Sequence, residues 1–157
     1  MRENKISNSS FCNFWENLKT NTSLLKINVS KTEINDRIVE KLCGCLQNTA
    51  SRLIDLDLSR NNITDIGLTA LAEAIVGLET LKYLNLGMNL IKDSGMPALV
   101  DYLIDPRCGL TELSLTGNRI NNEGIQTLAR FVRPNTSLKM LDISKNAFND
   151  IGFATFA

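Results

Sequence analysis

The residues that come nearest to a metal-binding pattern lie in the stretch D-L-D-L-S, residues 55 to 59. Asp55, Asp57 and Ser59 have the spacing of the first three ligands of a calcium-binding loop. Such a loop also needs a glycine at its sixth position and a glutamate at its twelfth, where this sequence has Arg60 and Ile66. We therefore predict no metal site and interpret the two aspartates as outward-facing side chains of a strand.

The residues needed for catalysis do not occur in the required combinations. The chain has four cysteines and no histidine, so neither a Ser-His-Asp nor a Cys-His nucleophile can form. A zinc site would need all four thiols, whose spacing differs from that of paired zinc knuckles. The sequence also lacks a glycine-rich phosphate loop with its lysine. We expect no catalytic residue, no cofactor and no small-molecule substrate, with reduced and mostly packed thiols at Cys12, Cys43, Cys45 and Cys108.

Charge and hydropathy exclude two further classes of partner. Seventeen Lys and Arg balance seventeen Asp and Glu over 157 residues, so no strong field attracts nucleic acid or an anionic membrane. The first 15 residues lack the apolar core of a signal peptide, and no later run approaches the length of a membrane span. We expect a soluble, cytoplasmic protein that binds neither nucleic acid nor membrane.

Five copies of one segment recur along the chain. The copies begin at Leu24, Leu53, Leu81, Leu110 and Leu138, with spacings of 29, 28, 29 and 28 residues. Each follows the pattern L-x-x-L-x-L-x-x-N-x-I, which predicts one short strand per repeat. Side chains two apart in a strand share a face, so Leu56 and Leu58 are expected inside and their polar neighbours outside.

An asparagine or its substitute recurs just after each strand. The column comprises Asn61, Asn89, Asn118 and Asn146, with Thr32 in the first full repeat. A chain that turns at the same place in every coil leaves backbone groups without ladder partners, and an inward asparagine can bond them in its own and the adjacent coil. We predict a structural asparagine ladder, beside which Asn62 is only an exposed neighbour.

The second half of each repeat has the spacing of a helix. Leu68, Leu71, Ala72 and Ile75 recur at helical intervals, and the same phase continues in residues 96–103 and 125–132. Thr64, Asn121 and Asn149 occupy N-cap positions, each followed by Asp or Asn, whereas Lys92 departs from the pattern. A glycine follows two residues after the acid position, which predicts close approach between successive helix starts, at Gly67, Gly95, Gly124 and Gly152.

These features together resemble the ribonuclease-inhibitor-like class of leucine-rich repeats. The resemblance rests on the alternating period, the N-x-I after the strand and the (D/N)-x-G entering a full helix, and it covers essentially the whole chain. It implies a right-handed, curved α/β solenoid with parallel strands on the concave face and helices on the convex face. It also implies a function in protein binding. The expected organisation is a single solenoid over 1–157, made of a partial repeat 1–23, repeats 24–52, 53–80, 81–109 and 110–137, and a truncated repeat 138–157.

Both ends of the chain fall inside a repeat. Residues 4–24 align with 118–138, matching Asn4 to Asn118 and Ile6 to Ile120. At the other end the pattern stops within the fifth helix, and no polar capping repeat is legible. We expect a truncated chain whose last coil leaves apolar side chains uncovered, namely Leu141, Ile143, Phe148, Phe153 and Phe156.

Three functions are compatible with this architecture. We favour a non-catalytic protein-binding module, because the outward strand residues vary between repeats while the inward ones do not. One alternative is a GTPase-activating accessory, since a Ran GTPase-activating protein uses this repeat type; Arg60 and Arg119 are the candidate residues. Another is the sensor or autoinhibitory repeat region of a larger nucleotide-binding immune-type receptor.

The outward strand positions form the predicted partner-binding site. The first column is Lys26, Asp55, Tyr83, Glu112 and Met140, and the second is Asn28, Asp57, Asn85, Ser114 and Asp142. Gly87 and Gly117 lack side chains, which predicts a shallow depression beside Tyr83 and Met88. An aromatic and two methionines rimmed by acids have the composition of an interface hot spot. We expect a protein partner that presents an apolar anchor flanked by Lys or Arg.

Overall fold

The computed structural model describes residues 8–47, 52–132 and 134–156. The side chains of Cys12, Val132 and Phe156, and the predicted equivalences of Asn4 and Ile6, lie outside the described part.

The described chain alternates helix and strand throughout. The elements in order are α1 (Asn8–Leu18), β1 (Lys26–Asn28), α2 (Asp36–Leu46), β2 (Asp55–Asp57), α3 (Asp65–Ile75), β3 (Tyr83–Asn85), the 3-10 turn η1 (Asp93–Gly95), α4 (Met96–Ile104), β4 (Glu112–Ser114), α5 (Asn122–Val132), β5 (Met140–Asp142), α6 (Asp150–Phe153) and η2 (Ala154–Phe156). Each strand and the helix after it make one coil of the predicted repeat.

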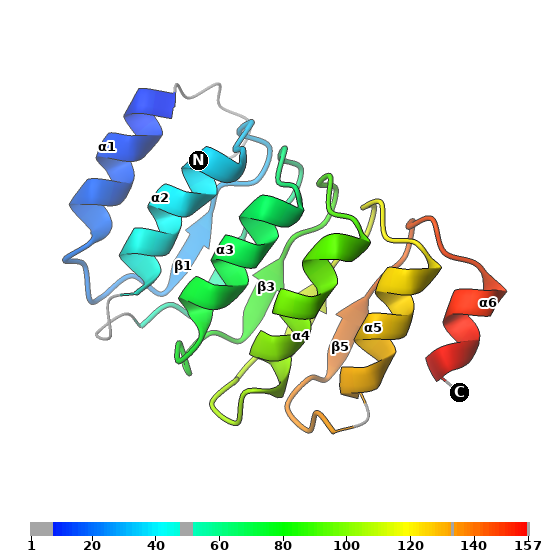
Figure 1. Ribbon diagram of the computed structural model, residues 1–157. Helices are drawn as coiled ribbons and strands as arrows, with labels where there is room; N and C mark the ends of the chain where they lie inside the picture. Colours follow the sequence, from blue (N-terminus) through cyan, green and yellow to red (C-terminus); the bar gives the residue numbers. More distant parts are fainter. Residues whose placement is uncertain (1–7, 48–51, 133, 157) are drawn as a thin grey trace.

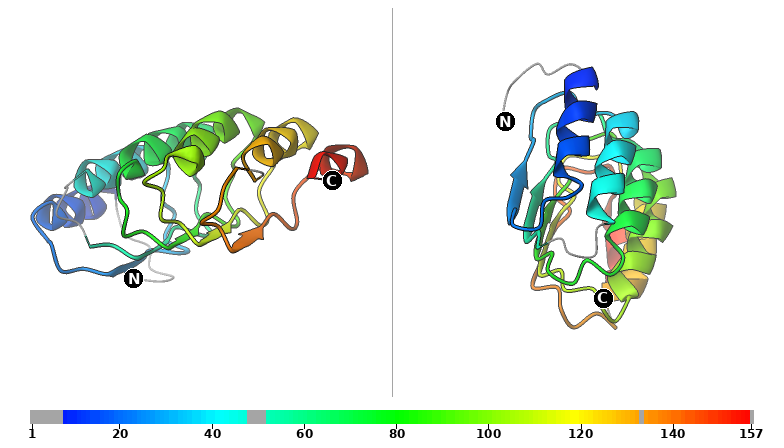
Figure 2. Two further views of the ribbon diagram at one scale, coloured as in Figure 1. Left: turned by 90° about the horizontal axis from the view of Figure 1, so that it is seen from below. Right: turned by 90° about the vertical axis from the view of Figure 1, so that its left-hand side faces the viewer.

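The strands form one parallel sheet in chain order, β1 to β5, and the helices form a second layer (Figure 1). Viewed from below, the helices follow the outer side of a gentle curve and the strands the inner side (Figure 2). The pairing aligns the middle residues Ile27, Leu56, Leu84, Leu113 and Leu141 across all five strands. The predicted α/β solenoid is confirmed.

The helix of the partial first repeat matches that of the fourth. α1 and α5 each have 11 residues and begin at Asn8 and Asn122, which the repeat alignment pairs. α1 packs on α2, so the helix layer starts one coil before the sheet. Its Phe11 and Trp15 are almost fully buried and cover the first strand's side of the core.

The core fills the space between the two layers. Leucines at the inward strand positions are fully buried, among them Leu56, Leu58 and Leu113. The helices contribute Leu68, Leu71 and their equivalents, as their spacing predicted. Fully burying each such side chain contributes about 1.5–3 kcal/mol, so the repeated leucines supply most of the driving force for stacking.

The predicted close approach at the recurring glycines takes place between neighbouring coils. Asp36 accepts hydrogen bonds from Thr64 N (2.8 Å) and the Thr64 hydroxyl (2.6 Å), both in the next coil. Asp65 accepts from Lys92 N (2.7 Å), and Asp93 from Asn121 N (2.7 Å). A side chain on Gly67, Gly95, Gly124 or Gly152 would meet the preceding coil's Asp36, Asp65, Asp93 or Asn122. These acids therefore join each helix start to the next, a second role beside the expected interaction with their own helix.

The helix starts follow the predicted caps and the predicted exception. The side chains of Thr64 and Asn149 accept from the backbone two residues on, and Asn121 directly precedes α5. Lys92 has no such hydrogen bond, and the chain there makes the 3-10 turn η1 before α4 begins. Where the side-chain cap is missing, the α-helix therefore begins later in the repeat, at Met96.

Two buried side-chain groups of the described residues, Trp15 Nε1 and the Tyr102 hydroxyl, have no hydrogen-bond partner. The Tyr102 hydroxyl of α4 makes no hydrogen bond within the described residues. Burial raises its pKa, and nearby Cys108 raises that pKa further. We expect Tyr102→Phe to increase the free energy of unfolding by about 1 kcal/mol, because it removes an uncompensated hydroxyl.

Urea unfolding measures this change, with exposed Tyr83→Phe as the matched control. The control is expected to stay within about 0.5 kcal/mol of the parent. A destabilised Tyr102→Phe variant would mean that the hydroxyl has a partner.

Candidate protein-binding face

The asparagine column forms a hydrogen-bonded ladder at the carboxyl ends of the strands. Asn61 Oδ1 accepts from Thr32 N and Ile34 N of the preceding coil (3.1 and 3.0 Å). Its Nδ2 donates to Val29 O in that coil and to Leu58 O in its own (3.0 and 2.9 Å). Asn89, Asn118 and Asn146 repeat this pattern. In the first full repeat, the Thr32 hydroxyl stands in for the asparagine: it lies 2.7 Å from Val29 O of its own coil and 3.5 Å from Asn61 Oδ1 of the next coil.

The residue before each ladder position adopts left-handed backbone. The φ angles are +57° at Lys31, +56° at Arg60, +58° at Met88, +67° at Gly117 and +55° at Lys145. This conformation costs about 1–2 kcal/mol for a non-glycine residue. The same tight turn therefore recurs in every coil, and Gly117 makes it without the steric cost.

The strand register brings the two predicted columns together on the concave face. Lys26, Asp55, Tyr83, Glu112 and Met140 pair in succession, and so do Asn28, Asp57, Asn85, Ser114 and Asp142. We call these ten residues the floor. Neighbouring members are about 4.8 Å apart along the stack.

In the part of the floor over β1 and β2, the side chains of the two strands bond one another. Lys26 Nζ lies 3.2 Å from Asp55 Oδ2, and Asn28 Nδ2 donates to Asp57 Oδ2 at 2.8 Å. A partner that bound here would have to displace these contacts.

The part over β3 to β5 presents apolar groups beside acids. Tyr83 is 41% exposed and Met140 is 50% exposed, with half-buried Glu112 between them. Asp142 adds a second carboxylate, whose pKa is lowered by hydrogen bonds from the Ser144 hydroxyl and backbone and by the charge of Lys145. Asp142 is therefore ionised at neutral pH.

The structure changes the geometry expected around Met88, while the role of Met88 in binding stays a prediction. Met88 lies three residues beyond the end of β3, in the left-handed turn and not on the strand that carries Tyr83. The predicted depression is also filled, because the Met88 side chain covers Gly117 and a Cβ on Gly87 would meet Thr116 Cγ2 at 2.9 Å. Met88 thus belongs to the turn edge, and Tyr83 and Met140 are the apolar pair of the floor.

The candidate catalytic side chains lie apart from one another. Arg60 and Arg119 are exposed at the turn edge, in different coils. Cys43 and Cys45 are buried free thiols, and burial raises the pKa of Cys43 to about 12. At neutral pH Cys43 therefore stays protonated, which makes it a poor nucleophile.

The described ranges contain neither a metal-binding cluster nor a membrane-spanning helix. Among residues 8–47, 52–132 and 134–156, no group of three or more Cys, Asp or Glu is arranged to hold a metal ion. No helix in this part of the chain has the length and apolar character of a membrane span.

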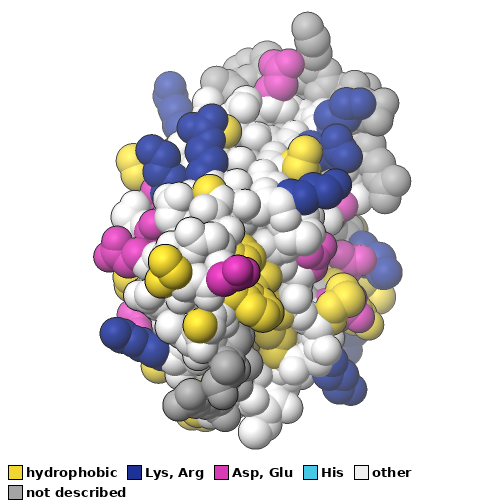
Figure 3. Space-filling view, turned by 90° about the vertical axis from the view of Figure 1, so that its right-hand side faces the viewer, with side chains coloured by type: hydrophobic (Ala, Val, Ile, Leu, Met, Phe, Trp, Pro, Cys, Tyr) yellow, Lys and Arg dark blue, Asp and Glu magenta, His cyan; other side chains and the backbone are white. Residues whose placement is uncertain are grey.

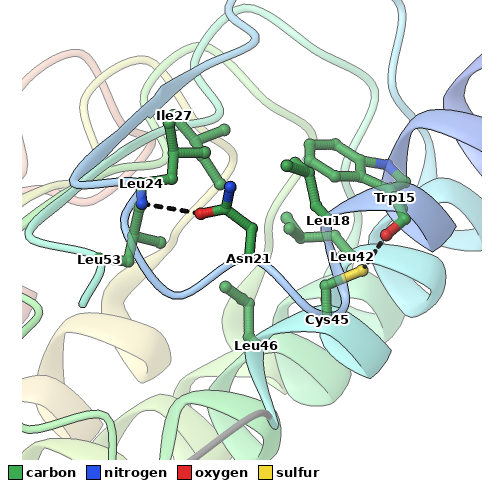
Figure 4. A pocket seen from close by; sticks show the side chains of 9 residues that line it. All are labelled: Trp15, Leu18, Asn21, Leu24, Ile27, Leu42, Cys45, Leu46 and Leu53. Carbon is green, nitrogen blue, oxygen red and sulfur yellow. Dashed lines mark hydrogen bonds between the residues drawn. The ribbon is translucent and has the colours of Figure 1, made fainter. Parts of the chain in front are cut away.

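A small cavity lies between α1, α2 and β1 (Figure 4). Trp15, Leu18, Ile27 and Leu42 contribute to its apolar lining, and the Cys45 thiol donates to Trp15 O at 2.8 Å. Its volume is about 30 Å³, which suits a water molecule rather than an organic ligand. The floor remains the candidate site.

Comparison with known proteins agrees with this geometry. A leucine-rich repeat family model matches residues 20–43, 53–72, 77–100, 109–129 and 135–157. The chain is 30% identical to ribonuclease inhibitor of Sus scrofa over 86% of its own length and 30% of that protein. It is 32% identical to NACHT, LRR and PYD domains-containing protein 14 of Mus musculus, over 86% of the chain and 14% of the relative. The chain thus spans less than a third of these relatives.

Two solved structures share this fold. The leiomodin-1 actin-binding site 2 structure superposes with a TM-score of 0.72 at 23% identity, covering 90% of this chain and 82% of that one. The tropomodulin C-terminal domain of Caenorhabditis elegans gives 0.69 at 17% identity, covering 96% and 89%. At these identities the likeness concerns the fold alone. Since the family model matches five segments that together make up most of the sequence, this chain belongs to the leucine-rich repeat family.

Proposed function

We propose that this chain is a non-catalytic module that binds a protein partner on the β3 to β5 part of its concave floor. The observation that carries the proposal is the exposed pair Tyr83 and Met140, which flanks Glu112 on a face without helices. Large apolar side chains surrounded by polar groups are typical of interface hot spots. The proposed partner presents an apolar anchor with an adjacent Lys or Arg.

The hydrogen bonds within the floor support placing the binding site over β3 to β5 and not over β1 and β2. Lys26, Asn28, Asp55 and Asp57 already bond one another. Tyr83 and Met140 gain burial on binding, and within the described part of the chain neither side chain has a hydrogen bond or ion pair to lose. We therefore assign the energetic centre to Tyr83 and Met140 and a peripheral role to β1 and β2.

The test compares two double variants against a partner isolated by pull-down. We expect Tyr83→Ala/Met140→Ala to weaken binding at least about tenfold, equivalent to about 1.4 kcal/mol. The control Glu73→Ala/Gln126→Ala changes exposed residues of α3 and α5 and is expected to leave the affinity unchanged. Isothermal titration gives the affinities and circular dichroism checks the fold. Equal binding by both variants would contradict the concave site.

A second candidate is a repeat region within a larger NACHT-type protein, favoured by the 32% identity over most of this chain. Protein binding and autoinhibition then use the same floor. The GTPase-activating alternative depends on Arg60 or Arg119, and a turnover assay with small GTPases and Arg60→Ala decides it. A cytoplasmic location belongs to the proposal too, and it is supported by the free thiols Cys43, Cys45 and Cys108.

A further inference from the structure

The turn edge beside the floor carries the opposite charge. We define the lip as two residues of each coil: the left-handed residue before the ladder position, and the residue two positions after that one. The first set is Lys31, Arg60, Met88, Gly117 and Lys145. The second set is Glu33, Asn62, Leu90, Arg119 and Ala147. Four basic and one acidic side chain give the lip a net charge of +3. The floor has one basic and four acidic side chains, a net charge of −3. The neutral composition thus conceals two separated charges of opposite sign.

Backbone hydrogen bonds hold the lip in register from coil to coil. Arg60 N donates to Gly87 O (2.8 Å), Met88 N to Thr116 O (2.6 Å) and Gly117 N to Ser144 O (2.9 Å). Arg119 N donates to Ile91 O of the preceding coil at 2.8 Å. These hydrogen bonds fix the backbone of the lip. Equivalent lip positions in neighbouring coils are therefore about 4.8 Å apart.

Three basic groups of the lip are exposed to a partner. Arg60, Arg119 and Lys145 are exposed, and no carboxylate of the described residues lies within 4 Å of their charged nitrogens. The nearby acids Asp36, Asp65 and Asp93 accept hydrogen bonds from the backbone of the following coil. Figure 3 shows Lys and Arg side chains gathered toward the top of the molecule, the edge at which the strands end in Figure 1.

The left-handed turn makes these residue types notable. Glycine suits that backbone, as at Gly117, yet three of the other four coils place the exposed cations Lys31, Arg60 and Lys145 there and the fourth places Met88. Conformational strain that persists at a surface points to a function for the side chain. Met88 lies between Arg60 and Arg119 along the stack and is 42% exposed, so an apolar contact stands among the positive charges.

We propose that the lip binds an acidic segment of a protein partner, in which an apolar residue is flanked by acids two positions away on each side. Arg60 and Lys145 are three coils apart, about 15 Å by strand spacing. Acids four residues apart in an extended peptide are about 13 Å apart, which matches that separation. The central apolar side chain then rests on Met88. The inference deepens the proposed concave-face function, and it is tested separately from it.

The test is an NMR titration of the isotope-labelled chain with a peptide containing Glu-Ser-Leu-Ser-Glu. We expect shifts of the amide resonances of Arg60, Met88, Arg119 and Lys145, and at least tenfold weaker binding by Arg60→Glu/Arg119→Glu/Lys145→Glu. The control Lys41→Glu/Arg52→Glu/Arg130→Glu makes the same charge change at exposed residues elsewhere. It is expected to bind within twofold of the parent.

Two further peptides and one polyanion complete the design. The Lys-Ser-Leu-Ser-Lys peptide is expected not to shift the lip resonances, and the Glu-Ser-Ser-Ser-Glu peptide is expected to bind more weakly because it lacks the apolar residue. Shifts scattered over the convex helices, or equal losses in both triple variants, would overturn the proposal. Binding of oligothymidylate as tight as that of the acidic peptide would also overturn it, in favour of a nucleic-acid site. None of these outcomes depends on Tyr83 or Met140, so the floor and the lip can fail independently.

Discussion

Replacing Asn89 with alanine is expected to lower the free energy of unfolding by about 2–4 kcal/mol, since a buried backbone donor left without its acceptor costs about 1–3 kcal/mol and further bonds are lost. Asn89 is 4% exposed. Its Oδ1 accepts from Ile63 N at 3.1 Å, and its Nδ2 donates to Leu58 O and Leu86 O at 3.1 and 3.0 Å. Each carbonyl retains a bond from a neighbouring ladder asparagine, whereas Ile63 N has no other side-chain acceptor among the described residues.

Two further variants make this prediction specific. Asn62→Ala removes an exposed asparagine and is expected to change stability by less than about 0.5 kcal/mol. Asn89→Asp keeps the shape and the acceptor but loses both donors, so its destabilisation should also exceed that of Asn62→Ala. Urea unfolding followed by circular dichroism gives all three values. A loss below about 1 kcal/mol for Asn89→Ala would show that water replaces the amide in the turn.

Alanine at two glycines is expected to shift stability in opposite directions. At Gly124, in the first turn of α5, a Cβ would lie 2.7 Å from Ile120 Cγ2 and 3.2 Å from Asp93 Cα. Overpacking of this kind destabilises by about 1–3 kcal/mol. At Gly44, within α2, the nearest atom is the flexible Lys19 Cε at 3.8 Å. Gly44→Ala should therefore stabilise by about 0.5–1 kcal/mol through helix propensity.

The same unfolding experiment measures both variants, and each serves as the control for the other. Since both changes add one methyl group to a helix, their difference isolates the contact with the preceding coil. Two stabilised variants would mean that neighbouring coils can separate to admit the methyl group, contrary to the geometry at Asp93.

Local alternation and repeat spacing were sufficient to predict the fold. Leu56 and Leu58 sit two apart, and the ladder residue follows at a fixed distance, so strand, turn and helix could be assigned in one coil and transferred to the others. The pairing of Tyr83 with Glu112 and of Glu112 with Met140 follows from that transfer. The fold and the order of the columns are therefore consequences of the period.

The repeat period of the sequence does not predict the three-dimensional course of the turn after each strand. The glycines Gly87 and Gly117 predict a depression shared by Tyr83 and Met88, whereas in the structure the strand ends between those two residues. Asp93 and Gly124 were interpreted separately, one for its charge and one for its size, because their contact joins different coils. Gly117 was the available signal for the left-handed turn, since a glycine at that position in one repeat indicates the backbone angle of all.

The direction of the asparagine ladder has a consequence for synthesis on the ribosome. Asn61 bonds backward to Thr32 N, Ile34 N and Val29 O. The turn of one coil therefore stays incomplete until the asparagine of the following coil has emerged, nearly one repeat later. Domains acquire structure from the amino terminus as the chain is made, and here each newly exported coil completes the hydrogen bonding of its predecessor. Nascent chains should thus gain structure in steps of one repeat, with the most recent coil always unfinished.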